Sequence, residues 1–236
     1  MKIRCYPTRE HASRDEIQGS TAVIIDVLRS SSSIIAAMGN GAEMIIPVDG
    51  VEAACNLVES SERGVKLLAG ERSGFPLDGF DLGNSPFEFM EESIKGKTII
   101  LTTSNGTRAI VEASKAERIL ICAINNVGAV AEAVRDAGGL SIICCGDEGV
   151  LAAEDMLCGG ILIGELSGII DEESIDDTGR LALMLAERHG DRPEELLRSC
   201  DHGRKLVSLG FERDIVHCST RDSACLVPEV RNGVIA

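Results

Sequence analysis

The stretch TAVIIDVLRSSSSIIAAMGNGA at residues 21–42 decides the fold of this 236-residue chain. Its first part, Thr21 to Val27, is a continuous apolar run broken only by Asp26, which predicts a strand buried on both faces of a sheet. The serines that follow predict the start of a helix over 31–39, which the glycines at its end close. A buried strand, a polar turn and a short helix form the repeating unit of α/β proteins.

The same alternation runs along most of the chain. Further strands are predicted at 44–48, 65–69, 98–102, 118–123 and 140–145, with a short one at 214–218. Helices are predicted at 51–61, 106–114, 127–135, 151–166, 178–189 and 193–199, and a long loop at 70–86. No linker rich in Ser, Gly or Pro divides the chain. We therefore expect one α/β unit with a mainly parallel sheet and helices on both faces.

Two segments of the chain echo each other. AVIIDVLRSSSSIIAAMGNGA at 22–42 and LSIICCGDEGVLAAEDMLCGG at 140–160 both combine a strand, a polar turn, a helix of small residues and a pair of glycines. Two related halves would explain this echo. Similar βα units also produce such echoes by chance, so the sequence leaves both explanations open.

The composition excludes several classes of protein. The 23 Lys and Arg residues against 38 Asp and Glu give a net charge of −15, and aromatic residues make up only 3%. Because nucleic-acid binding depends on neutralising phosphates, we expect no nucleic-acid partner. A hydrophobic content of 44% excludes disorder. No apolar run reaches the ~18 residues of a membrane helix, and residues 1–20 are too polar for a signal peptide, so no membrane association is expected.

The nine cysteines do not form a recognisable framework. None has CxxC spacing, and most lie in apolar runs such as the one that ends at Cys144 and Cys145. We expect small buried thiols in a protein of the reducing cytoplasm.

Candidate site residues lie directly after the predicted strands, where parallel sheets bind ligands. Asp26 ends the first strand, and a carboxylate in an apolar run is costly unless it is paired or holds a metal. It is therefore either a helix cap or an ion-pair partner of Arg29, or it is a metal ligand. If Asp26 is a metal ligand, Arg29 and the start of the helix, with Ser31 and Ser32, would bind an anion.

The loop at 70–86 carries a second group of candidates. Its glycines and prolines make it costly to order, and functional residues concentrate in such loops. We interpret Glu71 and Arg72 as functional residues and Asn84 as a substrate-binding residue. The alternative is a rigid surface loop whose polar groups only cap its turns.

The segment TTSNGTR at 102–108 follows another strand and precedes a helix. Its hydroxyls, amide and glycine at a helix N-terminus suit a phosphate or sulfonate, which makes Thr103, Asn105, Gly106 and Thr107 candidate substrate-binding residues. An elaborate helix cap is the alternative, although one hydroxyl would suffice for that. The chain has no GxxxxGK[ST] motif and no GxGxxG motif after a strand, so the usual signatures of nucleotide binding are missing.

A further set of carboxylates follows the strand at 140–145. Glu148 lies in the turn GDEG, and Glu154 and Asp155 are adjacent on an otherwise apolar helix. Burying two neighbouring carboxylates in an apolar core is energetically costly unless they are paired or bind a metal. Hard oxygen ligands of this kind suit Mg²⁺. The alternative is that this part of the helix faces solvent.

Taken together and in this order, these turns resemble the ComB-type 2-phosphosulfolactate phosphatase family. The strings that carry the resemblance are DVLRSSSS at 26–33, GERSGFPLDGFDLGNSPFEF at 70–89, LTTSNGTRA at 101–109, CGDEGVLAAEDMLCGG at 145–160 and LVSLGFERDIVHCSTRDSACLVP at 206–228. The chain departs from the family pattern at Ser30 and Ser31, where Ala and Thr are more usual, and at Ser104, where Thr is usual.

The resemblance implies a Mg²⁺-dependent phosphatase that converts 2-phospho-3-sulfolactate to 3-sulfolactate and phosphate, a step toward coenzyme M. It also implies a three-layer α/β/α fold with mainly parallel or mixed sheets, in one unit over 1–236 that divides near 115–135 if the halves are related. Two alternatives stay open: a phosphatase for another phosphorylated hydroxy acid, and a non-catalytic module that binds an anion or a metal. Whether the protein forms a homo-oligomer is also open.

A mechanism follows from the resemblance as a hypothesis. Mg²⁺ is held by carboxylates from the set Asp26, Glu71, Glu148 and Asp155. Arg29 and Arg72 stabilise the developing charge, and the turn at 102–107 binds one anionic end of the substrate. Either a water attacks phosphorus or Asp26 does so and forms an aspartyl-phosphate. The absence of a DxDx[TV] signature favours the water.

Overall fold

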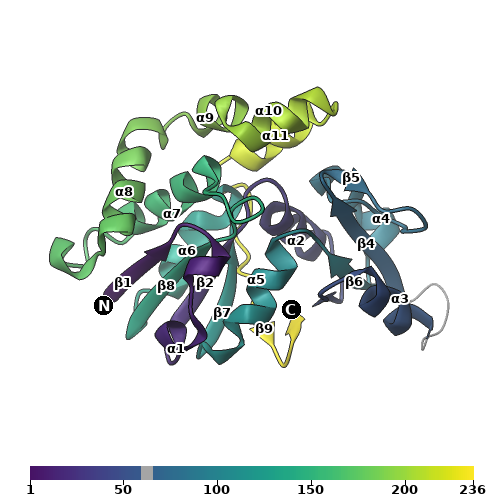
Figure 1. Ribbon diagram of the computed structural model, residues 1–236, viewed down its shortest axis with the longest axis horizontal. Helices are drawn as coiled ribbons and strands as arrows, with labels where there is room; N and C mark the ends of the chain where they lie inside the picture. The colour runs from purple at the N-terminus through teal and green to yellow at the C-terminus, as the bar shows by residue number, and fades with distance from the viewer. Residues whose placement is uncertain (60–65) are drawn as a thin grey trace.

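The computed structural model describes residues 1–59 and 66–236, and its strands form two sheets (Figure 1). Sheet A is entirely parallel, in the order β1 (Lys2–Tyr6), β8 (Gly139–Cys144), β2 (Thr21–Ile25) and β7 (Arg118–Cys122). Sheet B has the order β5 (Phe75–Pro76), β4 (Lys66–Arg72), β6 (Thr98–Thr102), β3 (Met44–Pro47), β10 (Val234–Ile235) and β9 (Val230–Arg231). Only β4, β6 and β3 run parallel in sheet B, so this sheet is mixed.

The last part of the chain joins the two sheets. The β9–β10 hairpin pairs with β3 of sheet B through Ile235 and Ile45. The residues just before this hairpin reach β7 of sheet A, where the Ile121 N–H donates a 2.9 Å hydrogen bond to the Pro228 carbonyl. The sheets are therefore held edge to edge through a segment from the far end of the sequence.

Helices surround both sheets. Their bounds are α1 Arg14–Ile17, α2 Ser30–Gly39, α3 Val51–Glu59, α4 Glu91–Ile94, α5 Gly106–Glu112, α6 Val127–Ala133, α7 Ala153–Glu165, α8 Asp177–His189, α9 Pro193–Ser199, α10 Asp201–Ser208 and α11 Glu212–Ser219. Short 3₁₀ turns occupy Arg9–His11, Pro86–Glu88, Ala113–Lys115, Ile124–Asn126 and Glu172–Ser174. None of the helices in the described ranges is long and apolar enough to span a membrane.

The continuous apolar strands have buried residues on both faces. In β2, Val23 and Ile25 face a core built with helices α6 to α11, whereas Ala22 and Ile24 face a second core with α1, α2, α5 and the inner face of sheet B. A third, smaller core lies between the outer face of sheet B and α3. The three-layer α/β/α fold expected from the sequence is confirmed, with helices on both faces of a parallel sheet.

Most element boundaries agree with the sequence, and one prediction is wrong. The strand at 98–102 and the helix at 193–199 are found with those bounds, whereas 214–218 lies in helix α11 and is not a strand. Ile215 and Cys218 are fully buried and Val216 is 44% exposed, which is helical spacing that the β-branched pair at 215–216 obscured. The predicted end of the helix at 60–61 and the strand start at 65 lie outside the described residues. The division into related halves stays a prediction.

Cysteines behave largely as expected of small apolar residues. Six are buried thiols, namely Cys5, Cys122, Cys144, Cys145, Cys158 and Cys218. Burial is the largest cause that raises the pKa of Cys145 and Cys158 well above the ordinary thiol value. The thiols of Cys145 and Cys158 therefore stay protonated and chemically inert.

Candidate functional site

A polar pocket lies at the carboxyl ends of β2, β4, β6 and β8. Helix α10 closes one side of it, and α9, α10 and α11 form one cluster beside the β4–β5 hairpin (Figure 1). The lining residues are Asp26, Leu28, Arg29, Glu71, Ser73, Gly74, Asn84, Ser104, Asn105, Asp147, Glu148, His202 and Lys205. This is the edge of a parallel sheet where ligands are expected to bind.

Asp26 lies at the base of this pocket, one residue beyond the end of β2. Its Oδ1 accepts a 3.2 Å hydrogen bond from the Ser30 N–H, and its own N–H donates to Ser31 Oγ at 3.0 Å. Its Oδ2 accepts no hydrogen bond from any residue that the structure describes. The carboxylate is therefore oriented through one oxygen while the other stays available to a ligand.

The glycine at the start of α5 makes room for this carboxylate. A Cβ built on Gly106 would lie 2.4 Å from Ser30 Oγ and 2.8 Å from Asp26 Oδ2. These distances are too short for any side chain larger than hydrogen. Gly106 thus contributes space and close approach, not a contact of its own.

Burial raises the pKa of Asp26 to about 6, from an ordinary value of 3.8. The negative charges of Glu71 and Glu154 act in the same direction. His202 and the Ser30 N–H act against it because they favour the ionised form. A cation beside this carboxylate would stabilise its charged form and lower its pKa.

Arg29 is held in a fixed position from three sides. Its Nη1 donates to Asp214 Oδ2 at 2.7 Å, its Nη2 donates to the Gly74 carbonyl at 2.9 Å, and its guanidinium lies 4.2 Å from the ring centroid of Phe211. Ser85 Oγ donates to the other Asp214 oxygen at 2.8 Å. The Asp26–Arg29 ion pair that the sequence left open is replaced by the pair between Arg29 and Asp214.

The side chains of Glu71 and Arg72 point in different directions, and only that of Glu71 faces the pocket. Glu71 lines the pocket, and its two oxygens accept hydrogen bonds from the Gly74 N–H at 2.8 Å and the Ser104 N–H at 2.9 Å. Arg72 instead donates to the Thr102 carbonyl at 3.3 Å and to Thr102 Oγ1 at 3.0 Å. Arg72 therefore ties β4 to the end of β6 and is not among the residues that line the pocket.

The turn after β6 is partly a cap and partly pocket wall. The Thr103 N–H donates to Thr107 Oγ1, and the Thr107 N–H donates to Thr103 Oγ1, each at 3.2 Å. These two hydroxyls are used within the turn. Ser104 and Asn105 face the pocket, and Asn105 Nδ2 donates to Asp147 Oδ1 at 3.4 Å.

The serines at the start of α2 serve the backbone around the pocket. Ser31 Oγ donates to the Ile24 carbonyl at 3.4 Å, and Ser32 Oγ donates to the Val27 carbonyl at 2.9 Å. Neither lines the pocket. Ser33 Oγ donates to the Asn84 carbonyl at 2.7 Å and so fixes Asn84, which lines the pocket and whose buried Oδ1 has no partner among the described residues.

The carboxylates of α7 are buried, not exposed to solvent. Asp155 Oδ1 accepts from the Val27 N–H at 2.8 Å, and its Oδ2 accepts from the Gly146 N–H at 3.1 Å. Burial raises its pKa well above the ordinary value. Asp155 is not among the lining residues. Its two hydrogen bonds instead join the turn after β2 to the turn after β8. Glu148 lies at the exposed rim with φ of 51°.

Helix α10 brings His202 and Lys205 to the pocket, although the sequence alone predicts no role for either. His202 Nδ1 lies 3.4 Å from Glu154 Oε1. Burial lowers the pKa of His202, but the carboxylates of Glu154, Asp26 and Asp147 more than offset this and raise it overall. His202 and Lys205 are three residues apart on a helix, which places both side chains on one face. This spacing is the signal in the sequence that indicates a shared site.

The donor set of the pocket fits Mg²⁺. The described residues contain no group of three or more His, Cys, Asp or Glu side chains arranged to hold a metal ion. Mg²⁺ in phosphate-processing sites keeps several waters and takes about one or two protein carboxylates together with substrate phosphate. Asp26 meets this requirement, because one of its oxygens is available and its buried negative charge would be stabilised by a cation. Glu71 and Glu148 supply further carboxylates in the same pocket.

Known proteins resemble this chain over nearly its whole length. The family model described as 2-phosphosulpholactate phosphatase matches residues 6–233. A protein of Caldanaerobacter subterraneus subsp. tengcongensis named "Probable 2-phosphosulfolactate phosphatase" is 36% identical over 236 residues, which covers 100% of this chain and 98% of that protein. Proteins with the same name from Thermotoga petrophila and Clostridium acetobutylicum are 38% identical over 92% of both chains and 33% identical over 100% of both chains.

Proposed function

The chain belongs to the 2-phosphosulpholactate phosphatase family, and from this we propose that it hydrolyses 2-phospho-3-sulfolactate to 3-sulfolactate and phosphate in a Mg²⁺-dependent reaction. One observation carries the proposal. A single pocket holds the Asp26 carboxylate, with one oxygen available, and the Arg29 guanidinium, fixed by Asp214. A carboxylate for a cation and an arginine for an anion are the two elements that metal-assisted phosphoryl transfer needs.

Asp26 would hold the metal, with Glu71 as the second candidate ligand. Bound Mg²⁺ would neutralise negative charge on the phosphoryl oxygens. The two backbone N–H groups that bind Glu71 fix the direction of its carboxylate. Glu148, at the exposed rim, is a candidate for an outer contact. Asp155 has a supporting role in this proposal because, unlike Glu71, it does not line the pocket and its hydrogen bonds join two turns beneath it.

Arg29 would orient the phosphoryl group and stabilise the charge that develops on it. Contacts with Asp214 and Gly74 use part of the guanidinium, and its remaining N–H donors are available to the substrate. Asn84 and Asn105 line the same pocket and would donate from their side-chain amides. We assign Ser31, Ser32, Thr103, Gly106 and Thr107 to the frame of the site, since their polar groups or close contacts lie within the protein.

The attacking group in the proposal is a water molecule. The water adds to phosphorus as the bond to the 2-oxygen of sulfolactate breaks, and the departing alkoxide takes up a proton to give the hydroxy acid. Attack by Asp26 itself would instead leave phosphate attached to the protein. A reaction with ³²P-labelled ester, quenched with acid during turnover, distinguishes these routes, because only attack by Asp26 leaves ³²P attached to the protein.

The proposal includes the setting of the reaction. We place the enzyme in the cytoplasm, which the six buried free thiols support. Its substrate is a small phosphorylated sulfonate or hydroxy acid, and a step toward coenzyme M is one setting in which such a compound is hydrolysed.

A phosphate-release assay tests the proposal. The panel is 2-phospho-3-sulfolactate, 2-phospholactate and other phosphate esters, each with Mg²⁺ or with EDTA. We expect the highest kcat/KM with the sulfonate ester and loss of turnover in EDTA. A clear preference for an ester without sulfonate would assign a different phosphorylated hydroxy acid. Binding of Mg²⁺ and phosphate without any release would instead identify a non-catalytic module.

A further inference from the structure

Three basic side chains from the described part of the chain line the pocket, and they differ in their partners. Arg29 forms a 2.7 Å ion pair with Asp214. His202 lies 3.4 Å from the Glu154 carboxylate. The side-chain ammonium of Lys205 forms no ion pair or hydrogen bond with any described residue. Its ammonium is the one positive charge at this site that the described residues leave unpaired.

The helix that carries Lys205 is firmly held. Leu206, the next residue, is fully buried in the main core. A Cβ on Gly203 would lie 1.6 Å from the Leu197 carbonyl, so α10 packs directly against the end of α9. The contact between His202 and Glu154 adds a third attachment, one helical turn from Lys205. The stem of Lys205 is therefore presented to the pocket from a rigid element.

We propose that Lys205 binds the anionic group of the substrate that is not transferred, a sulfonate or a carboxylate. It thereby sets a preference for phosphate esters that carry a second strong anion. This inference rests on the proposed phosphatase function. Four carboxylates line the pocket, from Asp26, Glu71, Asp147 and Glu148, so a second substrate anion needs a positive partner of its own.

The chemistry of lysine suits this role. Arg29 lies beside Asp26 at the base of the site and is committed to the phosphoryl group in the proposed reaction. A lysine ammonium is a compact charge with rotatable donors, which adapts to a tetrahedral sulfonate or to a planar carboxylate. A charge-assisted hydrogen bond of this kind contributes about a 10-fold to 100-fold gain in binding.

The test compares three esters in four proteins. The esters are 2-phospho-3-sulfolactate, 2-phospholactate, and isopropyl phosphate, which has no second anion. The proteins are the unchanged enzyme, Lys205→Met, Lys205→Arg and Arg204→Met. We expect Lys205→Met to lower kcat/KM for 2-phospho-3-sulfolactate by about 10-fold to 100-fold and to leave isopropyl phosphate unchanged. Lys205→Arg should restore most of the loss.

The response to 2-phospholactate identifies the group that Lys205 binds. A loss limited to the sulfonate ester supports binding of the sulfonate, and a loss with both anionic esters supports binding of the carboxylate. An equal loss with isopropyl phosphate would show that Lys205 acts on the phosphoryl group, and this would overturn the proposal. The absence of any loss would overturn it as well.

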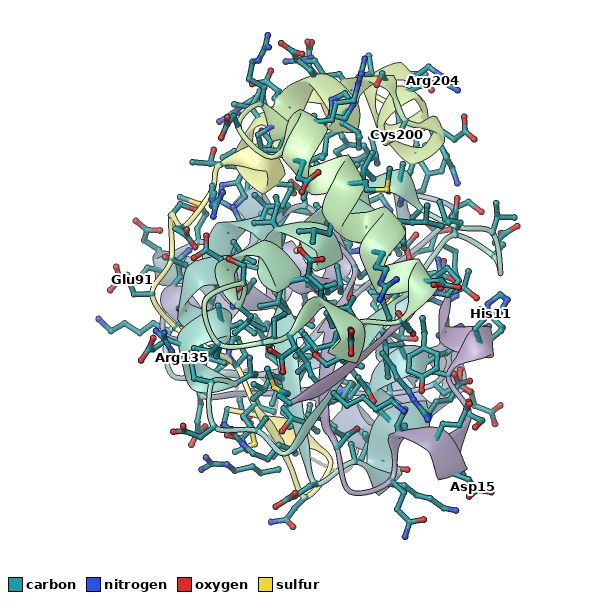
Figure 2. The ribbon with its side chains drawn as sticks, turned by 90° about the vertical axis from the view of Figure 1, so that its left-hand side faces the viewer. His11, Asp15, Glu91, Arg135, Cys200 and Arg204 are labelled. Atoms are coloured by element: carbon teal, nitrogen blue, oxygen red, sulfur yellow. The ribbon has the colours of Figure 1, made fainter. Side chains whose placement is uncertain are left out.

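Arg204 is the matched control because it lies next to Lys205 on the same helix. Its guanidinium bonds to Asp201 and to the Ser199 carbonyl, and Figure 2 shows it at the outer edge of the molecule. Arg204→Met should not change the selectivity among the esters. If the unchanged protein hydrolyses no ester, the proposed function fails, and calorimetric binding of 3-sulfolactate then tests Lys205 directly. About tenfold weaker binding by Lys205→Met supports the inference, whereas equal or absent binding in both proteins overturns it.

Discussion

Arg29 and Asp214, 185 positions apart in the sequence, form a 2.7 Å ion pair whose side chains are only 2% and 3% exposed. Asp214 lies on α11, so the guanidinium that lines the pocket is fixed by a helix from the last part of the chain. Removing one partner of such a pair leaves an uncompensated buried charge. The docking of α11 is therefore a requirement for the geometry of the site.

We predict that Asp214→Ala destabilises the protein by about 3–5 kcal/mol, because it leaves Arg29 buried and unpaired. The exposed pair of Lys115 and Asp15, with a separation of 2.9 Å, is the control. Asp15→Ala should lower the free energy of unfolding far less, because solvent screens an exposed pair. Urea denaturation of both variants measures the difference. Similar losses in the two variants would show that burial of the Arg29 pair does not matter.

We predict that Asp26→Asn lowers kcat by at least about 100-fold, since the amide can neither hold Mg²⁺ as a carboxylate does nor act as a base or nucleophile. The substitution keeps the shape of the side chain. Circular dichroism and a urea midpoint no lower than that of the unchanged protein would establish that the fold is retained. Turnover close to normal would exclude Asp26 from the reaction.

The raised pKa of Asp26 also predicts how stability depends on pH in the metal-free protein. Because the neutral carboxyl is favoured in the folded state, its contribution to stability is fully present below pH 3.8 and is lost as the pH rises through about 6. Asn at this position does not titrate. In EDTA, the unchanged protein should therefore lose roughly 2 kcal/mol of stability relative to Asp26→Asn between pH 4 and 7. Urea unfolding at intervals of one pH unit measures this loss, and parallel curves for the two proteins would contradict it.

We predict that Gly106→Ala impairs the site more than the fold. The added Cβ would meet Ser30 Oγ at 2.4 Å and Asp26 Oδ2 at 2.8 Å, so the Asp26 carboxylate must move. We expect a loss of about 1–3 kcal/mol in stability and at least about tenfold in kcat/KM. Gly138→Ala is the control, because nothing lies within 4 Å of its Cβ. If the two variants have equal activity, the close approach at Gly106 is not needed.

The sequence predicted the frame of the molecule well because the strands are nearly continuous apolar runs. Strand β6 and helix α9 have the predicted bounds, and the carboxyl ends of β2, β4 and β6 meet at one pocket. Periodicity is a property of neighbouring residues, so it is visible in the sequence. Directions of side chains at the strand ends are not local properties. Glu71 and Arg72 are adjacent, yet only Glu71 faces the pocket.

The contribution of the last helices was not predictable in the same way. His202 and Lys205 reach the pocket only because α10 packs on α9 and turns one face to the strand ends. The β-branched residues Ile215 and Val216 predict a strand that begins at Asp214, although tertiary packing places all three residues in a helix. These residues depend on contacts between segments that are far apart in the sequence, which no local pattern records.

Asp155 has a mechanical consequence for the site. One carboxylate accepts the N–H of Val27 through one oxygen and the N–H of Gly146 through the other. The turn that carries Asp26 and the turn that carries Asp147 are thereby clamped to one rigid point on α7. A displacement of either turn is transmitted to the other, so the two walls of the pocket open or close together and not independently.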